Sequence, residues 1–183
     1  MLWDEMLTFE GRKISLVSIL LLAAFAGGAR AEASREYQVK AAFLFNFAQF
    51  VQWPDATLGI NDSLIIVTVG ADPFDGALDR AVAGKTIGAH HIEVKHVSSA
   101  SEIGKCHLLF VPAGQNTSEI LAAVGDKPIL TIGESDNFTD AGGDIRFFID
   151  DGKIRFEIDP DTTSKAGLKV SSKLLGLARI HRK

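Results

Sequence analysis

Tyr37-Gln-Val-Lys-Ala-Ala-Phe-Leu-Phe-Asn-Phe-Ala-Gln-Phe-Val-Gln-Trp-Pro54 is the densest aromatic stretch of this 183-residue sequence. Phe43, Phe47 and Phe50 are four and three positions apart, a spacing that places side chains on one face of an α-helix. Polar residues interrupt the apolar run, so it is too short and too polar to span a membrane. Proline cannot continue a helix, so we expect the helix to end before Pro54. The pattern predicts a core helix against which a sheet packs.

The residues before this stretch have the features of an export signal. Arg12 and Lys13 precede an almost unbroken apolar run, residues 14–25, which small residues and Ala29-Arg30-Ala31 follow. A basic flank, a short apolar core and a small-residue cleavage site indicate a secretory signal peptide. We expect residues 1–31 to be removed near Ala31, which leaves residues 32–183 as one periplasmic domain without membrane insertion. The alternative is a retained membrane anchor.

The composition and charge of the chain limit the classes of function that it can have. The formal net charge is −4, and this mild acidity argues against nucleic acid as a partner. The chain has one cysteine, Cys106, so it cannot form an intramolecular disulfide. Cys106 precedes an apolar run, which favours a small buried side chain over a reactive thiol. A hydrophobic content of 46% can supply a core without disulfides.

Apolar runs alternate with short helical patterns between residues 64 and 133. Strands are expected at residues 64–70, 91–97, 107–111 and 129–133, and helices at residues 74–82 and 118–124. Asp72 and Pro73 suit the N-cap and the first residue of the earlier helix. Strands that alternate with helices at this spacing predict βαβ units and a mostly parallel sheet.

The end of the chain has a different pattern. Asp151-Gly152 between residues 147–150 and 153–158 is the signal of a type I′ hairpin, and strict alternation in the second strand predicts a half-exposed or edge strand. Two more helices are expected, one after Asp159-Pro160 that ends in a Schellman motif at residues 166–168, and one capped by Ser171. The last helix is expected to bury Leu174, Leu175, Leu177 and Ala178. The predicted fold is α/β: a single three-layer domain with a mostly parallel sheet flanked by helices and a C-terminal antiparallel hairpin.

Motifs for catalysis or metal binding are missing from the sequence. His90 and His96 would lie about 20 Å apart along one strand, too far to share an ion. Glu134 and Asp136 are close in sequence, but a loop of such residues is ordinary turn chemistry. We therefore expect no catalytic residues, no metal and no cofactor. Three loops, residues 70–73, 112–117 and 133–138, follow predicted parallel strands, so they gather at the edge where such sheets bind ligands.

Four segments resemble the YfiR/HmsC-type periplasmic family: residues 40–54, 128–134, 152–158 and 166–175. Their order and spacing fit across essentially the whole chain after the export signal. The resemblance implies a non-enzymatic regulator that forms dimers. It would bind the periplasmic sensor region of an inner-membrane diguanylate cyclase and repress it, which lowers cyclic di-GMP and biofilm formation. The alternative function is a periplasmic small-ligand binding module that uses the carboxyl-end crevice of the sheet.

The resemblance also implies where the partner binds. The matching positions are Glu157, Thr163, Lys169 and Ser171, which we expect to contact the partner. We expect Glu157 and Lys169 to be exposed charges, whose reversal weakens binding and leaves the fold intact. The family's best-known repressor uses disulfides, one of them redox-sensitive, and Cys106 matches one of its cysteines. The partner position of Cys106 is not cysteine here, so an internal disulfide is excluded, which leaves a bridge between two chains as an alternative.

Overall fold

The structure is a computed structural model that describes residues 32–60 and 62–182. The expected signal peptide, residues 1–31, and its cleavage near Ala31 lie outside the described residues. Residues 37–183 form one compact unit. A helix covers residues 32–50 and ends just before Pro54, as the aromatic stretch predicts. None of the helices among the described residues combines the length and the apolar character that a membrane span needs.

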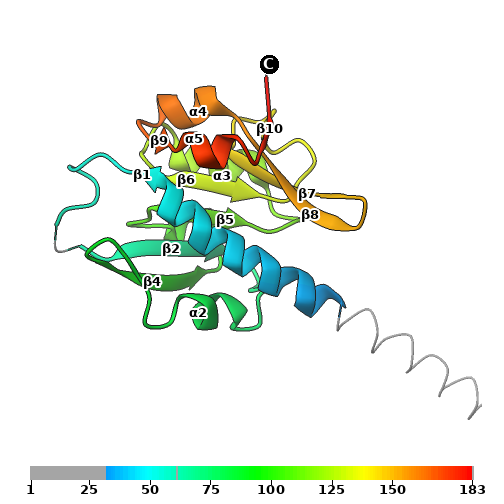
Figure 1. Ribbon diagram of the computed structural model, residues 1–183, viewed down its shortest axis with the longest axis horizontal. Helices are drawn as coiled ribbons and strands as arrows, with labels where there is room; N and C mark the ends of the chain where they lie inside the picture. Colours follow the sequence, from blue (N-terminus) through cyan, green and yellow to red (C-terminus); the bar gives the residue numbers. More distant parts are fainter. Residues whose placement is uncertain (1–31, 61, 183) are drawn as a thin grey trace, which may run out of the picture. The chain divides into compact units, whose positions relative to one another are not determined.

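The elements after this N-terminal helix follow one another in short segments (Figure 1). The strands are β1 (Val51–Gln52), β2 (Leu64–Val69), β3 (Thr86–Ile87), β4 (His90–Val97), β5 (Leu108–Val111), β6 (Leu130–Gly133), β7 (Ile145–Asp150), β8 (Lys153–Ile158), β9 (Lys169–Val170) and β10 (Arg179–Ile180). The helices are α2 (Ala77–Val82), the 3-10 turn η1 (Ala100–Glu102), α3 (Thr117–Val124), α4 (Pro160–Lys165) and α5 (Ser172–Leu175).

The central sheet has the order β10-β8-β7-β6-β5-β2-β4-β3. Its pairs are parallel except for the two hairpins, β7–β8 and β3–β4. A second, two-stranded sheet joins β1 to β9, far apart in sequence. Strands β2, β5 and β6 are buried along their whole length, which fits strands that are covered on both faces. The predicted α/β fold with a mostly parallel sheet and an antiparallel hairpin is confirmed.

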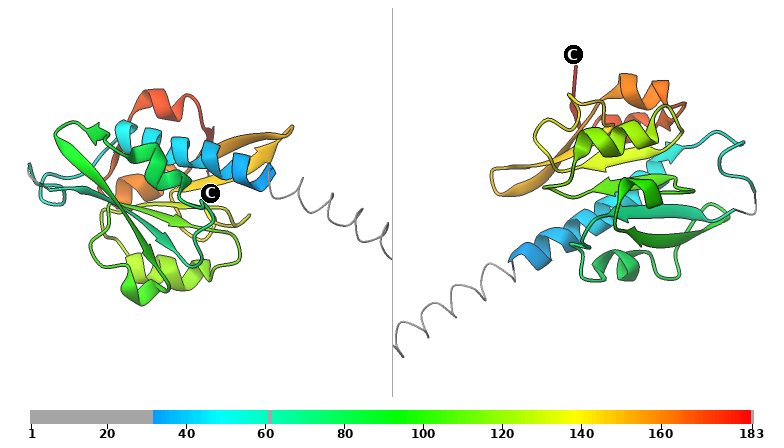
Figure 2. Two further views of the ribbon diagram at one scale, coloured as in Figure 1. Left: turned by 90° about the horizontal axis from the view of Figure 1, so that it is seen from below. Right: turned by 180° about the vertical axis from the view of Figure 1, so that it is seen from behind.

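Two apolar clusters lie on the two faces of the sheet. The larger contains Leu44 and Phe47 of the N-terminal helix and the buried side of α2, and the smaller contains Ile120 and Val124 of α3. Figure 2 shows the N-terminal helix and α3 on opposite faces. Strands β2 and β5 therefore supply alternate side chains to the two clusters, as the period of a strand requires. This arrangement accounts for the aromatic stretch: its helix is the main cover of one face.

The hairpin β7–β8 packs directly against that helix. Phe147 pairs with Phe156 across the strands, and the ring of Phe47 lies 4.9 Å from that of Phe156 and 5.7 Å from that of Phe147. The turn has φ angles of 48° at Asp151 and 67° at Gly152, both in the left-handed region that a type I′ turn uses. The predicted hairpin and its turn are confirmed.

Several local expectations are wrong. Helix α2 begins at Ala77 instead of residue 74, because the carboxylate of Asp72 accepts the Phe74 N–H and closes a turn before the helix. The last helix ends at Leu175, and the chain then adds β10 beside β8. Leu177 lies in the connection and is 74% exposed instead of buried. β8 is therefore covered in part and is not the outermost strand.

Candidate functional site

Lys169 and Ser171 are brought to the end of the N-terminal helix by the small sheet β1–β9. Lys169 pairs with Gln52 across the two strands, and the Ser171 N–H donates to the Phe50 carbonyl over 2.8 Å. The Ser171 hydroxyl caps α5 by accepting the Lys173 N–H. Local sequence predicts this cap, but the pairing with β1 depends on contacts between residues more than a hundred positions apart.

A cavity of about 400 Å³ lies at this junction. Its lining residues are Gln49, Phe50, Gln52, Lys169, Val170, Ser171 and Ser172. Lys169 is exposed and Ser171 is half-buried, so both are accessible from outside. The surface offers one cation, two amide side chains, hydroxyl groups and an aromatic ring. Such a set can bind a polar or acidic segment with hydrogen bonds and one ion pair.

Glu157 has a different environment. Its side chain is 6% exposed, so the expectation that it is an exposed charge is wrong. One carboxylate oxygen accepts hydrogen bonds from Thr139 Oγ1 (2.7 Å) and Arg146 Nε (2.8 Å), and the other accepts from Arg179. Burial by itself raises the pKa of this carboxyl group, but the hydrogen bonds from Arg146, Thr139 and Arg179 outweigh it and lower its pKa from 4.5 to about 2.

The two arginines explain why Glu157 is charged although it is buried. Arg146 lies beside it on β7, and Arg179 comes from β10, so the carboxylate joins three strands of the sheet. Both guanidinium groups also lie over the ring of Phe148, Arg179 at 3.9 Å from the ring centre and Arg146 at 5.4 Å. Alternation along β8 could show that Glu157 shares a face with Lys153 and Arg155, but it could not reveal that β10 covers this position.

Thr163 is also buried. Its hydroxyl donates to the Pro160 carbonyl within α4, and its carbonyl accepts the Leu168 N–H. The second bond belongs to the Schellman motif that the sequence predicts, together with the bond from the Gly167 N–H to the Ser164 carbonyl. Thr163 thus fixes the turn that leads from α4 into β9. The structure brings Lys169 and Ser171 together at one cavity, which Glu157 and Thr163 do not line.

The loops at the carboxyl ends of the strands do gather, as the sequence predicts. Glu134 accepts the Ala113 N–H over 2.8 Å, which joins the loops after β6 and β5. The same carboxylate is buried against Lys40 Nζ and accepts the Tyr37 hydroxyl of the N-terminal helix. The charge of Glu134 is therefore already paired by an internal lysine.

A second cavity, of about 220 Å³, lies between α3 and α4. Asp144 lies at its wall, and its Oδ2 accepts the N–H and the hydroxyl of Thr131, at 2.9 and 2.8 Å. Burial raises the pKa of Asp144 from 3.8 to about 6, against the opposing hydrogen bonds from Thr131 and Thr162. The bond to the Thr131 N–H extends the β6–β7 ladder by one residue, so a structural role accounts for this side chain.

Three of the five histidines and the cysteine have hydrogen-bond partners within the protein. His107 Nδ1 accepts the Ile65 N–H, and burial lowers the pKa of His107, which favours the neutral ring. His90 and His96 are bonded to Asp62 and Thr68, respectively. Cys106 is buried, and burial raises its thiol pKa to about 12. Within the described part of the chain, no group of three or more His, Cys, Asp or Glu side chains could hold a metal ion.

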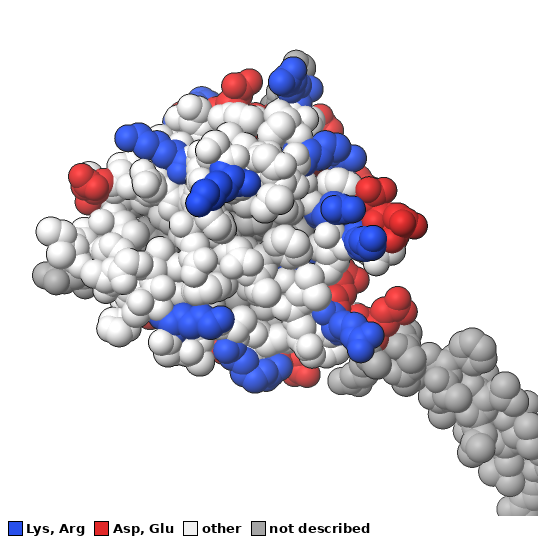
Figure 3. Space-filling view, viewed as in Figure 1, with Lys and Arg blue, Asp and Glu red and all other residues white. Residues whose placement is uncertain are grey.

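The charges of the surface do not form a single-sign field on the face drawn in Figure 3. Lysines and arginines lie there around a broad uncharged area, with acidic side chains near several of them. The N-terminal helix contributes exposed Asn46 and Gln49 and half-buried Phe50 to its exposed side.

Comparison with known families gives one match. A family profile described as YfiR/HmsC-like matches residues 37–179, which is most of the chain and contains all four segments of the resemblance. The match begins at Tyr37 in the aromatic helix and ends at Arg179, the residue of β10 that binds Glu157. A comparison with curated proteins finds no match. The chain belongs to the YfiR/HmsC-like family.

Proposed function

We propose that this protein is a periplasmic, non-enzymatic regulator that binds the periplasmic sensor region of an inner-membrane diguanylate cyclase. Binding represses the cyclase, so cyclic di-GMP and biofilm formation fall. The observation that carries the proposal is the family match over residues 37–179, because this family is known for periplasmic regulators of diguanylate cyclases. The export features of residues 1–31 support the same compartment.

The proposed contact surface is the cavity beside β9. Lys169 and Ser171 line it together with Gln49, Phe50 and Gln52. An exposed lysine beside amide and hydroxyl groups suits an acidic, hydrogen-bonding segment of the sensor region. An aromatic ring at the same place supplies the apolar area that interface centres use.

Glu157 and Thr163 belong to the proposal in another role. Both are buried, so they act through the segments they hold in place: Glu157 ties β10 to the hairpin, and Thr163 fixes the entry into β9. Reversal of the Glu157 charge would therefore disturb the fold as well as any interface. For this reason the interface is tested at Lys169.

A small-ligand module at the carboxyl-end crevice has less support. The acidic side chain at that edge, Glu134, is already held by Lys40, Tyr37 and the Ala113 N–H. The cavity beside β9 and the cavity between α3 and α4 are lined by other residues.

Co-purification from detergent-solubilised membranes tests the proposal. Tagged wild-type protein should capture a membrane protein that has a cytoplasmic cyclase domain. Lys169→Glu should lose this capture, whereas Lys173→Glu, a reversal at another exposed lysine four positions away and outside the cavity lining, should retain it. If both variants captured the same amount of the membrane protein, the cavity would not be part of the interface. If the wild-type protein captured no cyclase, the proposed function would be contradicted.

A further inference from the structure

Asp144 is a buried carboxylate without an internal counter-ion. The residue is 3% exposed, and among the described residues no lysine, arginine or histidine forms an ion pair with it. Its hydrogen-bond donors are neutral: the N–H and the hydroxyl of Thr131 and the hydroxyl of Thr162. They do not offset the burial, which raises the pKa of Asp144 to about 6. An ionised Asp144 therefore lowers the stability of the fold at neutral pH.

Three other acidic side chains of low exposure are compensated. Glu134 is paired with Lys40, and Glu157 is paired with two arginines. Asp159 caps the start of α4 and accepts two backbone N–H groups there. Buried charges are normally paired in this way, because their transfer from water is costly. Asp144 departs from this pattern, and it lies at the wall of a cavity.

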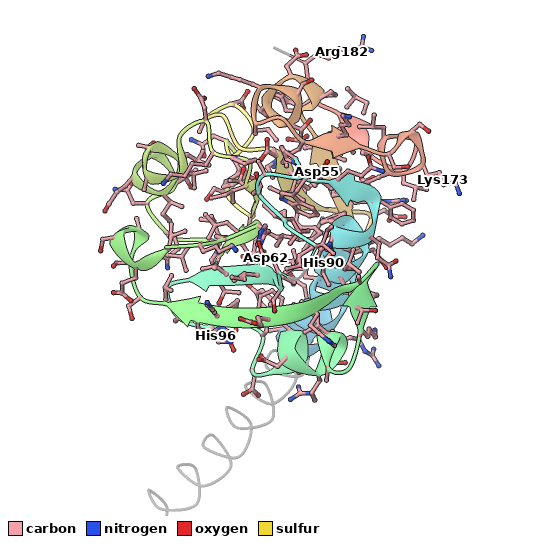
Figure 4. All side chains as sticks on the ribbon, turned by 90° about the vertical axis from the view of Figure 1, so that its left-hand side faces the viewer. Asp55, Asp62, His90, His96, Lys173 and Arg182 are labelled. Carbon is pink, nitrogen blue, oxygen red and sulfur yellow. The ribbon has the colours of Figure 1, made fainter. Side chains whose placement is uncertain are left out.

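The cavity between α3 and α4 gives this carboxylate an apolar neighbourhood. Figure 4 shows α3 (yellow-green) and α4 (orange), with the yellow loop between β6 and β7 near both. Thr162 lines the cavity together with Asp144. Thr131 uses only Oδ2 of Asp144, so Oδ1 can accept further hydrogen bonds. The apolar lining residues are Leu121, Val124, Ile129 and Ala166.

The rest of the lining leaves the charge of Asp144 unbalanced. Helix α3 ends at the cavity, and the C-terminal carbonyls of a helix carry partial negative charge. The lining contains two lysines, and both have partners of their own. Lys165 pairs with Asp126 over 3.0 Å, and Lys127 Nζ donates to the Ala123 carbonyl. The cavity therefore combines one buried anion, a helix C-terminus and an apolar wall, a set that suits a cation with an apolar body.

We propose that this cavity binds a primary alkylammonium ion, with its nitrogen at Asp144 and its alkyl chain along the apolar wall. An ammonium group has three donors and no acceptor. Asp144 supplies the opposite charge, and the Thr162 hydroxyl oxygen beside it can accept a second N–H. An apolar cavity of about 150 Å³ holds benzene, so one of about 220 Å³ has room for a chain of roughly four to six carbons.

Other classes of ligand fit the cavity less well. A metal ion needs several oxygen or nitrogen ligands, and no group of three or more His, Cys, Asp or Glu side chains in the part of the chain that the structure describes could hold one. An anion would be repelled by Asp144. A neutral alcohol would fill the apolar part but would leave the carboxylate without a counter-ion. The site shares no lining residue with the cavity beside β9, so it does not depend on the proposed contact with a cyclase.

Protonation of Asp144 competes with binding of the ammonium group. Burial raises the pKa of Asp144 to about 6, and the charge of nearby Asp159 acts in the same direction. The other charged groups of the lining, Asp126, Lys127 and Lys165, are exposed. A primary alkylammonium keeps its proton well above pH 7. About one tenth of the Asp144 carboxyl groups are ionised at pH 5 and about nine tenths at pH 7, so affinity should rise about tenfold over this range.

Isothermal titration calorimetry of the wild-type protein, purified in the form that the cell exports, tests the proposal. n-Pentylamine should bind, and 1-pentanol, which has the same chain without the charge, should bind at least about tenfold more weakly. Binding of pentylamine at pH 6 should release about half a proton, measured from the dependence of the heat on the ionisation enthalpy of the buffer. General attraction of a cation to a negative surface would release none.

The same chemistry has two sources, a free amine and the side chain of a lysine. Nα-acetyl-lysine methylamide carries the same ammonium group on a peptide unit. Tighter binding of this compound than of pentylamine would assign the site to a lysine side chain of a protein, and weaker binding would assign it to a free amine.

Two matched substitutions locate the ammonium group. Asp144→Asn keeps the size of the side chain but removes its charge, so it should weaken pentylamine binding at least about tenfold and abolish the pH dependence. Asp126→Asn removes the same charge from an exposed position and should change the affinity less than about threefold. Equal weakening by both substitutions would overturn the proposal. So would any of three results with the wild-type protein, which need no variant to fold: no binding of pentylamine at about 10 mM, binding of pentanol as tight as that of pentylamine, or no proton release at pH 6.

Discussion

Replacement of Glu157 by glutamine removes a buried charge that joins three strands. The side chain keeps its size but loses the ion pairs with Arg146 and Arg179. The guanidinium group of Arg146 is only 11% exposed and would keep one partner, the exposed Asp136. A mostly buried cation would thus lose its better partner, which costs far more than the loss of a surface pair.

The magnitude can be worked out from the pKa of Glu157. A fall from 4.5 to about 2 corresponds to roughly 3 kcal/mol, at about 1.4 kcal/mol per pKa unit. Arg179 is 53% exposed, and solvent screening lowers its share, so we expect a loss of about 2–3 kcal/mol at pH 7. Because the folded pKa is depressed, this stability is present above pH 4.5 and is lost as pH falls from there to about 2. Glu157→Gln should therefore be less stable than wild type at pH 7, and the difference should shrink towards pH 2.

Urea denaturation across this pH range measures both effects. Asp126→Asn is the matched control, because Asp126 forms an ion pair with Lys165 but is 74% exposed. The control should change the free energy of unfolding by less than about 0.5 kcal/mol. A Glu157→Gln variant that is as stable as the control at pH 7, or whose deficit persists unchanged at pH 2, would refute the role of Glu157 as the charged link between the three strands.

Three further substitutions test the core. Phe47→Ala should lower the free energy of unfolding by roughly 3–5 kcal/mol, because the fully buried ring contacts Phe147 and Phe156. If urea denaturation showed a loss below about 2 kcal/mol, the helix would cover less of the sheet than these contacts indicate. Gly143→Ala should lower the free energy of unfolding by about 1–3 kcal/mol or more, because a Cβ there would overlap the Phe138 ring. Gly176→Ala is the control: this position has room for a Cβ and helical geometry, so the substitution should not change thermal unfolding measurably. Asp144→Asn should flatten the pH dependence of stability between about pH 4 and 6. The raised pKa of Asp144 makes the wild type lose stability as pH rises through this range. If stability had the same slope against pH in both proteins, the claim that burial raises the pKa of Asp144 would be contradicted.

Much of the fold can be predicted from local patterns in the sequence. The continuous apolar runs of β2, β5 and β6, the Asp151-Gly152 turn and the caps at Asp159 and Ser171 each have a local chemical cause, and each is found as predicted. Apart from the start of α2, where Asp72 closes a local turn, the features that were not predicted depend on contacts between residues far apart in the sequence. Two-residue strands such as β9 and β10 have no periodicity of their own, and they form because the rest of the fold places a partner beside them.

The candidate functional site likewise combines features that local sequence predicts with features that depend on long-range contacts. Lys169 is accessible, as a lysine after a turn should be, but the cavity that it lines needs β1 from the far end of the chain. Alternation places Glu157 on the polar face of β8, and sequence could not show that Arg179 returns to cover it. Asn46 lies within the aromatic stretch but is exposed, so the apolar face of this helix is narrower than its composition indicates.

The level of cyclic di-GMP in living cells tests the central claim most directly. Cells that lack this protein should contain more cyclic di-GMP than the parent strain, and wild-type protein or Lys173→Glu should restore the parent level. Lys169→Glu, made to the same periplasmic amount, should fail to restore it. A deletion that leaves cyclic di-GMP unchanged would contradict the claim that this protein represses a diguanylate cyclase.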